Sequence, residues 1–119
     1  MDLPASSAGS GVSQEFIVAL STFPDAETAR KISRELVENA LVACANIVPA
    51  VESIYFWKDQ VEQSSEVLTI FKLTATRFGE FSKRLRQLHP YDVPEIIQLN
   101  VAEGSADYLR WIGESCSRV

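Results

Sequence analysis

Several residue types are scarce in this chain of 119 residues, and each scarcity argues against a class of protein. Only two cysteines are present, Cys44 and Cys116, which is too few for a small secreted scaffold held together by disulfides. The longest uninterrupted apolar run covers residues 40–45, far short of the roughly 18 residues that a membrane helix needs. The sequence therefore predicts two reduced thiols in a cytoplasmic protein without a membrane partner.

Basic residues are fewer than acidic residues in this chain. The chain has 11 Lys and Arg against 16 Asp and Glu, for a formal net charge of −5. A nucleic-acid partner requires a cationic footprint, and no basic patch stands out, so the sequence predicts no nucleic-acid partner. Hydrophobic residues make up 46% and charged residues 23%, which is ordinary for a globular domain with its own core.

The chain divides into a leader and one folded unit. Residues 1–14 are small and polar, and we interpret them as a flexible leader. Residues 15–119 carry the apolar periodicity of a single domain. Runs rich in β-branched and aromatic residues predict strands, and apolar residues at steps of three and four predict helices. The predicted strands cover residues 16–22, 43–57, 61–75 and 95–102.

Helices are predicted after the first, third and fourth of these strands. They begin after three candidate N-caps, Asp25, Thr76 and Ser105. The resulting order is β-α-β-β-α-β-α. Its first six elements match the split βαβ arrangement, so the sequence predicts an α+β, ferredoxin-like βαββαβ sandwich with an extra C-terminal helix.

Two features of the strands predict an assembly. The strands over 43–57 and 61–75 would each reach roughly 50 Å, so their hairpin should project past its own sheet. Pro49 predicts either a bulge or a point where the strand leaves the sheet. The strands are also apolar on both faces, whereas this fold covers only one face with helices. An open apolar face of that size is unusual on a monomer, and a partner subunit is the simplest cover.

Few residues are candidates for catalysis or for binding a metal or ligand. The only histidine, His89, lies in the segment HPYDVPE together with Tyr91 and Glu95. Three interpretations stay open for it: a cap at a helix end, a contact to a ligand or metal, and acid/base catalysis. The last one would make the protein an enzyme that uses His89 with Tyr91 and Glu95.

Cys44 and Lys72 each allow two interpretations. Cys44 is either a small core residue or a ligand, and no Cys-x-x-Cys or His-x-x-x-His spacing accompanies it to indicate a zinc site. Lys72 interrupts an apolar strand, so it either meets a carboxylate or a bound anion, or extends to solvent at a rim. The chain has neither a glycine-rich phosphate loop nor a nucleophile elbow.

Taken together, these segments resemble the CutA family of divalent-cation tolerance proteins. The resemblance spans about residues 15–115, nearly the whole predicted domain. It rests on the stretches 22–25 (TFPD), 41–47 (LVACANI), Pro49 with 53–57 (SIYFW), Glu66, Lys72, 89–95 (HPYDVPE), and Gly104 with 108–112 (YLRWI).

The resemblance implies a tight homotrimer whose long hairpins embrace neighbouring subunits. It implies a non-catalytic role in tolerance to copper and other divalent ions, with no required cofactor and with His89, Glu95 and Cys44 as metal ligands. Two alternatives stay open beside the enzyme, namely a PII-like sensor of small effectors and a structural scaffold. The cleft between subunits would be lined by Asn46, Tyr55, Trp57, Lys72, His89, Tyr91, Glu95 and Trp111.

Three positions depart from the family pattern. Some metal-associated bacterial members carry a thiol where this chain has Ser21, and a second histidine where it has Leu88. Both departures remove ligands that bind copper well, which weakens a high-affinity copper site. The hairpin turn of the family usually carries glycine where Asp59 stands.

Overall fold

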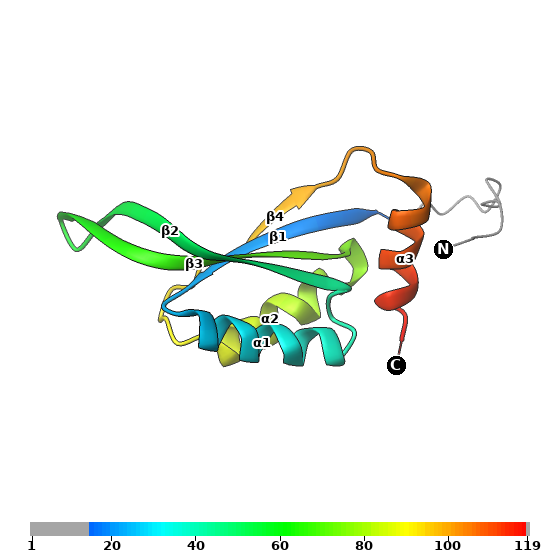
Figure 1. Cartoon of the computed structure of the whole chain (residues 1–119), viewed down its shortest axis with the longest axis horizontal. Coiled ribbons are helices and arrows are strands. Elements are labelled where there is room, and N and C mark those ends of the chain that lie inside the picture. Colours follow the sequence, from blue (N-terminus) through cyan, green and yellow to red (C-terminus); the bar gives the residue numbers. More distant parts are fainter. Residues whose placement is uncertain (1–14, 119) are drawn as a thin grey trace.

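The computed structural model describes residues 15–118, which form one antiparallel sheet with helices on one face and at one end (Figure 1). This confirms the α+β class and the predicted element order, while the leader predicted over 1–14 lies outside the described residues. Within 15–118, no helix is both long and apolar enough to cross a membrane. The elements are β1 (Phe16–Phe23), α1 (Ala26–Glu38), β2 (Cys44–Trp57), β3 (Gln60–Thr74), the 3₁₀ turn η1 (Ala75–Arg77), α2 (Phe78–Leu88), β4 (Ile97–Asn100) and α3 (Ala106–Ser115).

The sheet has the strand order β2-β3-β1-β4, and all neighbouring strands are antiparallel. β1 lies between β3 and β4 and pairs with β3 along its whole length. β4 is shorter than the predicted strand over 95–102. In the register of β1 and β4, Glu95 would face Thr22, but the Thr22 carbonyl already accepts a hydrogen bond from the His89 ring, so the ladder stops.

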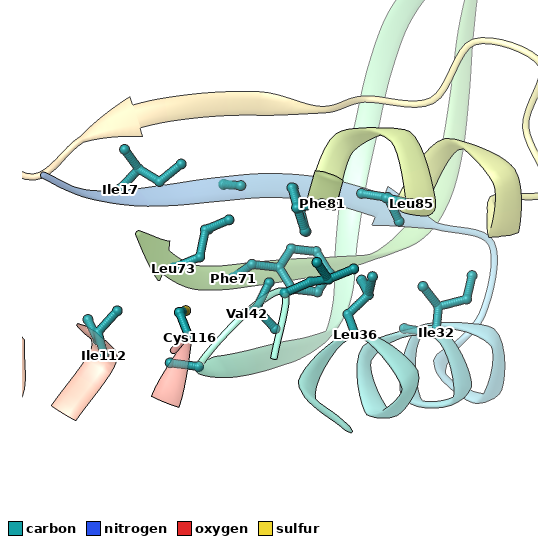
Figure 2. Packing of buried hydrophobic residues seen from close by; sticks show 14 of the residues in the cluster. Ile17, Ile32, Leu36, Val42, Phe71, Leu73, Phe81, Leu85, Ile112 and Cys116 are labelled. Atoms are coloured by element: carbon teal, nitrogen blue, oxygen red, sulfur yellow. The ribbon is translucent and has the colours of Figure 1, made fainter. Parts of the chain in front are cut away.

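One face of the sheet packs on α1 and α2. Ile17, Ala19, Ser21 and Phe23 point to this covered face and are fully buried. Figure 2 shows strand side chains meeting those of the helices, and the Phe71 ring meets the Phe81 ring edge-on at 5.1 Å between centroids. Each large apolar side chain in this layer, such as Phe71 or Phe81, contributes about 1.5–3 kcal/mol by leaving water, so this layer holds the fold together.

The three predicted helix starts have different outcomes. Asp25 caps α1 as expected, because its Oδ1 accepts the Thr28 N–H at 2.7 Å. The Thr76 prediction is wrong, since the chain leaves β3 through η1 and Thr76 lies inside that turn, with its hydroxyl 3.1 Å from that of Thr74. α2 then begins at Phe78. Ser105 occupies the N-cap position of α3 without a side-chain hydrogen bond.

The β2–β3 hairpin projects past the rest of the subunit, as predicted (Figure 1). The molecule measures 53 Å along its long axis and 25 and 23 Å across it. The register shifts between Val48 and Val51, so the bulge, one of the two alternatives predicted for Pro49, is confirmed. At the tip, Lys58 and Asp59 turn the chain with φ values of 49° and 64°, in the left-handed region.

The other face of the sheet, here called the open face, has no helix laid across it within the described residues (Figure 1). It carries Val18 and Leu20 of β1 and Leu68 and Ile70 of β3, all of them half-buried. The same side of the hairpin carries the partly exposed aromatic residues Tyr55 (43% exposed) and Trp57 (46% exposed). The structure thus confirms that the strands are apolar on both faces.

Candidate binding site on the open face

The strand register brings most of the predicted site residues to the open face. Directly paired residues of neighbouring strands point to the same side, and Cys44 pairs with Lys72 on that side. Asn46 follows two positions later on β2. Because the bulge adds one residue, Tyr55 and Trp57 also point to this side.

One set of these residues, the lysine group, lies near α3. It consists of Lys72, Cys44, Asn46, Tyr108 and Trp111. The Lys72 ammonium lies 5.6 Å from the centre of the Tyr108 ring, and that ring is 5.5 Å from the Trp111 ring. The Cys44 thiol donates to Asn46 Oδ1 at 3.5 Å. Lys72 is therefore stabilised by an aromatic face, a partner that neither interpretation of the sequence named.

A second set, the acidic group, lies towards the root of the hairpin. It consists of Glu66, Tyr91, Glu95 and the neighbouring Tyr55. The Tyr91 hydroxyl donates to Glu66 Oε2 at 2.8 Å, and burial together with this bond raises the pKa of Tyr91. Burial, followed by the charge of Glu66, raises the pKa of Glu95. Tyr55 Oη lies 3.4 Å from Ser64 Oγ and contributes to the pKa shift of Tyr91.

His89 lies beside the acidic group but is held by the backbone. Nε2 is 2.8 Å from the Thr22 carbonyl oxygen, and Nδ1 accepts the Tyr91 N–H at 3.1 Å. Burial lowers the pKa of His89, although the Thr22 bond and Glu66 oppose that shift. An acid/base role for this ring would require one of the two hydrogen bonds to break.

The lysine group and the acidic group do not meet within one chain. Lys72 and Glu66 are six residues apart on β3, which is roughly 20 Å at the usual rise. Trp57 lies farther out at the hairpin tip, with the Lys58 ammonium 5.9 Å from its ring. Glu66 was not predicted as a site residue, although it continues the alternation of Leu68, Ile70 and Lys72 on β3, and that pattern could have identified it.

The predicted metal ligands are not gathered into one site in a single subunit. No group of three or more His, Cys, Asp or Glu side chains in residues 15–118 could hold a metal ion. Cys44 stands opposite Lys72, a cation, while Glu95 belongs to the acidic group. A single subunit therefore offers separate donors and no complete coordination sphere.

The family of this chain follows from its similarity to known proteins. Residues 17–115 match the CutA1 divalent ion tolerance protein family. The chain belongs to the CutA family. The divalent-cation tolerance protein CutA of Thermus thermophilus is 46% identical over 98 residues, which cover 82% of this chain and 95% of that protein.

Other CutA proteins agree with this assignment. Protein CutA of Homo sapiens is 40% identical over 110 residues, which cover 92% of this chain and 62% of that protein. The crystal structure of the divalent ion tolerance protein CutA1 from Ehrlichia chaffeensis matches the subunit with a TM-score of 0.84 at 29% identity. That match covers 90% of this chain and 100% of the other. The fold of the subunit is thus the CutA fold.

Proposed function

We propose that this CutA-family chain is a non-catalytic divalent-cation tolerance protein, built as a homotrimer of ferredoxin-like subunits and working in the cytoplasm. The observation that carries the proposal is the open face, with Val18, Leu20, Leu68 and Ile70 lying outside the intramolecular core. Packing these side chains against sister copies removes a large apolar surface from water. The similarity to the divalent-cation tolerance protein CutA of Thermus thermophilus supports the physiological role.

The positions of the two polar groups support a head-to-tail assembly. The lysine group is cationic and the acidic group is anionic, and their β3 residues, Lys72 and Glu66, are six positions apart along the strand. In a cyclic trimer each contact joins two different surfaces of identical chains. Lys72 of one subunit is then drawn towards Glu66 of the next by opposite charge, and the cleft between them uses residues of both chains.

This cleft is where we propose that a divalent cation such as copper binds. For a given site of nitrogen, oxygen and sulfur donors, Cu²⁺ has the highest affinity among the first-row divalent ions, so mixed donors such as a carboxylate and a thiol favour it over the others. Glu95 and Cys44 lie in different groups of one chain, so two subunits are needed to bring them together. A complete site therefore depends on assembly.

Sedimentation at micromolar concentration tests the assembly. The chain has a mass of 13.2 kDa, and the expected particle has three times that mass. A stable, soluble particle of 13.2 kDa would contradict the trimer and the shared cleft with it.

Calorimetric titration with Cu²⁺ tests the cation site. Glu95→Gln should weaken Cu²⁺ binding by about tenfold, because it removes a charged oxygen donor. Glu103→Gln is the matched control, since Glu103 is exposed in the loop before α3. Equal affinities for wild type and Glu95→Gln would remove Glu95 from the site.

A further inference from the structure

The His89 ring is held by two parts of the chain, β1 and the segment at Tyr91. His89 follows α2 directly and is only 8% exposed. Its ring stacks on Phe23 of β1, with 4.7 Å between centroids and 18° between planes. On the other side the Tyr91 ring lies 4.8 Å away. The imidazole is therefore fixed in place by packing, before any ligand is considered.

The hydrogen bonds of the ring determine which nitrogen carries the proton. The Tyr91 N–H can only donate, so Nδ1 of His89 must have its lone pair free to accept. The Thr22 carbonyl can only accept, so Nε2 must carry the hydrogen. Both requirements are met by one neutral tautomer. No lone pair of the imidazole then remains for a metal ion, which binds histidine through an unprotonated nitrogen.

The position of Pro90 explains why the Tyr91 amide needs this acceptor. Proline has no N–H, so Tyr91 carries the first free backbone donor after α2 ends. A buried donor without a partner is costly, and Nδ1 of His89 supplies the partner two residues back. This contact turns the chain so that the Tyr91 hydroxyl reaches Glu66.

We propose that His89 is a positioning residue of the cleft rather than one of its metal ligands: by bonding Thr22 and Tyr91, it fixes the segment 89–95 so that the Tyr91 hydroxyl meets Glu66. The inference deepens the proposed function, because it rests on the cleft being the binding site. It assigns ligand contact to Glu66, Tyr91 and Glu95. A metal at His89 and an ordered segment 89–95 are then mutually exclusive.

Nitrogen NMR of the imidazole is a direct test, because the chain has one histidine and gives one pair of ring signals. We expect a protonated Nε2 and an unprotonated Nδ1. Additions of Zn²⁺ up to one equivalent per chain should leave both signals in place. A ring-nitrogen signal that moves at substoichiometric Zn²⁺, or a proton found on Nδ1, would overturn the proposal.

Two variants separate positioning from ligation. His89→Asn keeps an acceptor near the place of Nδ1, whereas His89→Gln keeps a donor near the place of Nε2. Hydrogen exchange of the Tyr91 amide should stay near the wild-type rate in His89→Asn and become about tenfold faster in His89→Gln. Equal acceleration in both variants would show that the Nδ1 contact does not hold the segment.

Metal binding by the same variants gives the second readout. His89→Asn should bind Cu²⁺ within about twofold of wild type, since the acidic group stays in place. A loss of about a hundredfold in both folded variants would identify His89 as a ligand and overturn the proposal. The zinc titration of the wild type does not depend on how well either variant folds. Sedimentation mass reports on the trimer separately, so failure of the assembly and failure of the His89 assignment are distinguishable.

Discussion

The two faces of the sheet are built by the same strands and are apolar to a similar degree, yet they differ in what covers them. On β3, Phe71 and Leu73 point to the covered face and are fully buried, while Leu68 and Ile70 point to the open face and are half-buried. The helices account for the first outcome. No helix covers Leu68 and Ile70 within the described residues, so one copy of the chain leaves these apolar side chains partly exposed.

The largest effect is expected on the covered face. Phe71→Ala should lower the free energy of unfolding by about 3–5 kcal/mol, because it removes a buried ring and leaves a cavity beside Phe81. Urea unfolding followed by circular dichroism measures this loss. A cost below about 1 kcal/mol would show that this face is not the core of the subunit.

A charge on the open face should break the assembly while leaving the subunit folded. Leu20→Lys places an ammonium group among the apolar side chains that we assign to subunit contacts. The sedimentation mass should fall to the 13.2 kDa of one chain, with unchanged helical circular dichroism. Glu38→Lys at the exposed end of α1 is the control and should leave the mass unchanged. If Leu20→Lys unfolds the subunit, the open face belongs to the monomer core.

The hairpin turn lies outside both faces and should respond more weakly. Asp59 has a φ of 64°, a backbone conformation that glycine adopts without a steric penalty. Asp59→Gly should therefore raise the free energy of unfolding by about 1 kcal/mol. Thermal unfolding measures the gain, and Asp92→Gly in the segment after α2 serves as a comparison. A lower melting temperature for Asp59→Gly would mean that the aspartate side chain stabilises the tip.

The smallest effect is a pH dependence at the edge of the open face. Burial raises the pKa of Glu95, so the folded state holds its proton more tightly than the unfolded state does. The associated stability is fully present below the ordinary glutamate pKa of about 4.3, and it is lost as pH rises through the folded pKa. Glu95→Gln should thus be slightly more stable than wild type at pH 7, by less than about 0.5 kcal/mol.

Melting temperatures of the pair across pH check this prediction. The two proteins should converge below about pH 4, where Glu95 is protonated in both states of the wild type. Glu103→Gln, with its carboxyl in an exposed loop, should show no such trend. A Glu95→Gln variant that is less stable than wild type at pH 7 would show that the charged carboxylate has a stabilising partner.

Much of the fold follows from local patterns in the sequence. The apolar run over 16–22 predicted a strand, Asp25 predicted the start of α1, and Pro49 predicted an irregularity in β2. Each of these features depends on neighbouring residues and the local geometry of the chain. The projecting hairpin could be predicted too, since the length of two consecutive strands sets its reach.

The missed features depend on contacts between distant residues. The pairing of β4 with β1 ends where it does because the Thr22 carbonyl already accepts a hydrogen bond from the ring of His89, which is 67 positions away in sequence. The role of Glu66 appears only once the segment after α2 brings Tyr91 to it. The sequence identified His89 as a candidate functional residue. Which of its ring nitrogens carries the proton depends on the Thr22 carbonyl and the Tyr91 N–H, whose positions only the fold determines.

The bulge between Val48 and Val51 acts as a phase shift along β2. If all the residues of β2 paired regularly, without the bulge, every later side chain of the strand would rotate by half a period, and Ile54 and Phe56 would replace Tyr55 and Trp57 on the open side. Deleting one residue between Val48 and Val51 would instead leave a regular strand, in which Tyr55 and Trp57 keep their place on the open side. The extra residue of the bulge thus corrects a mismatch in alternation between the two halves of β2.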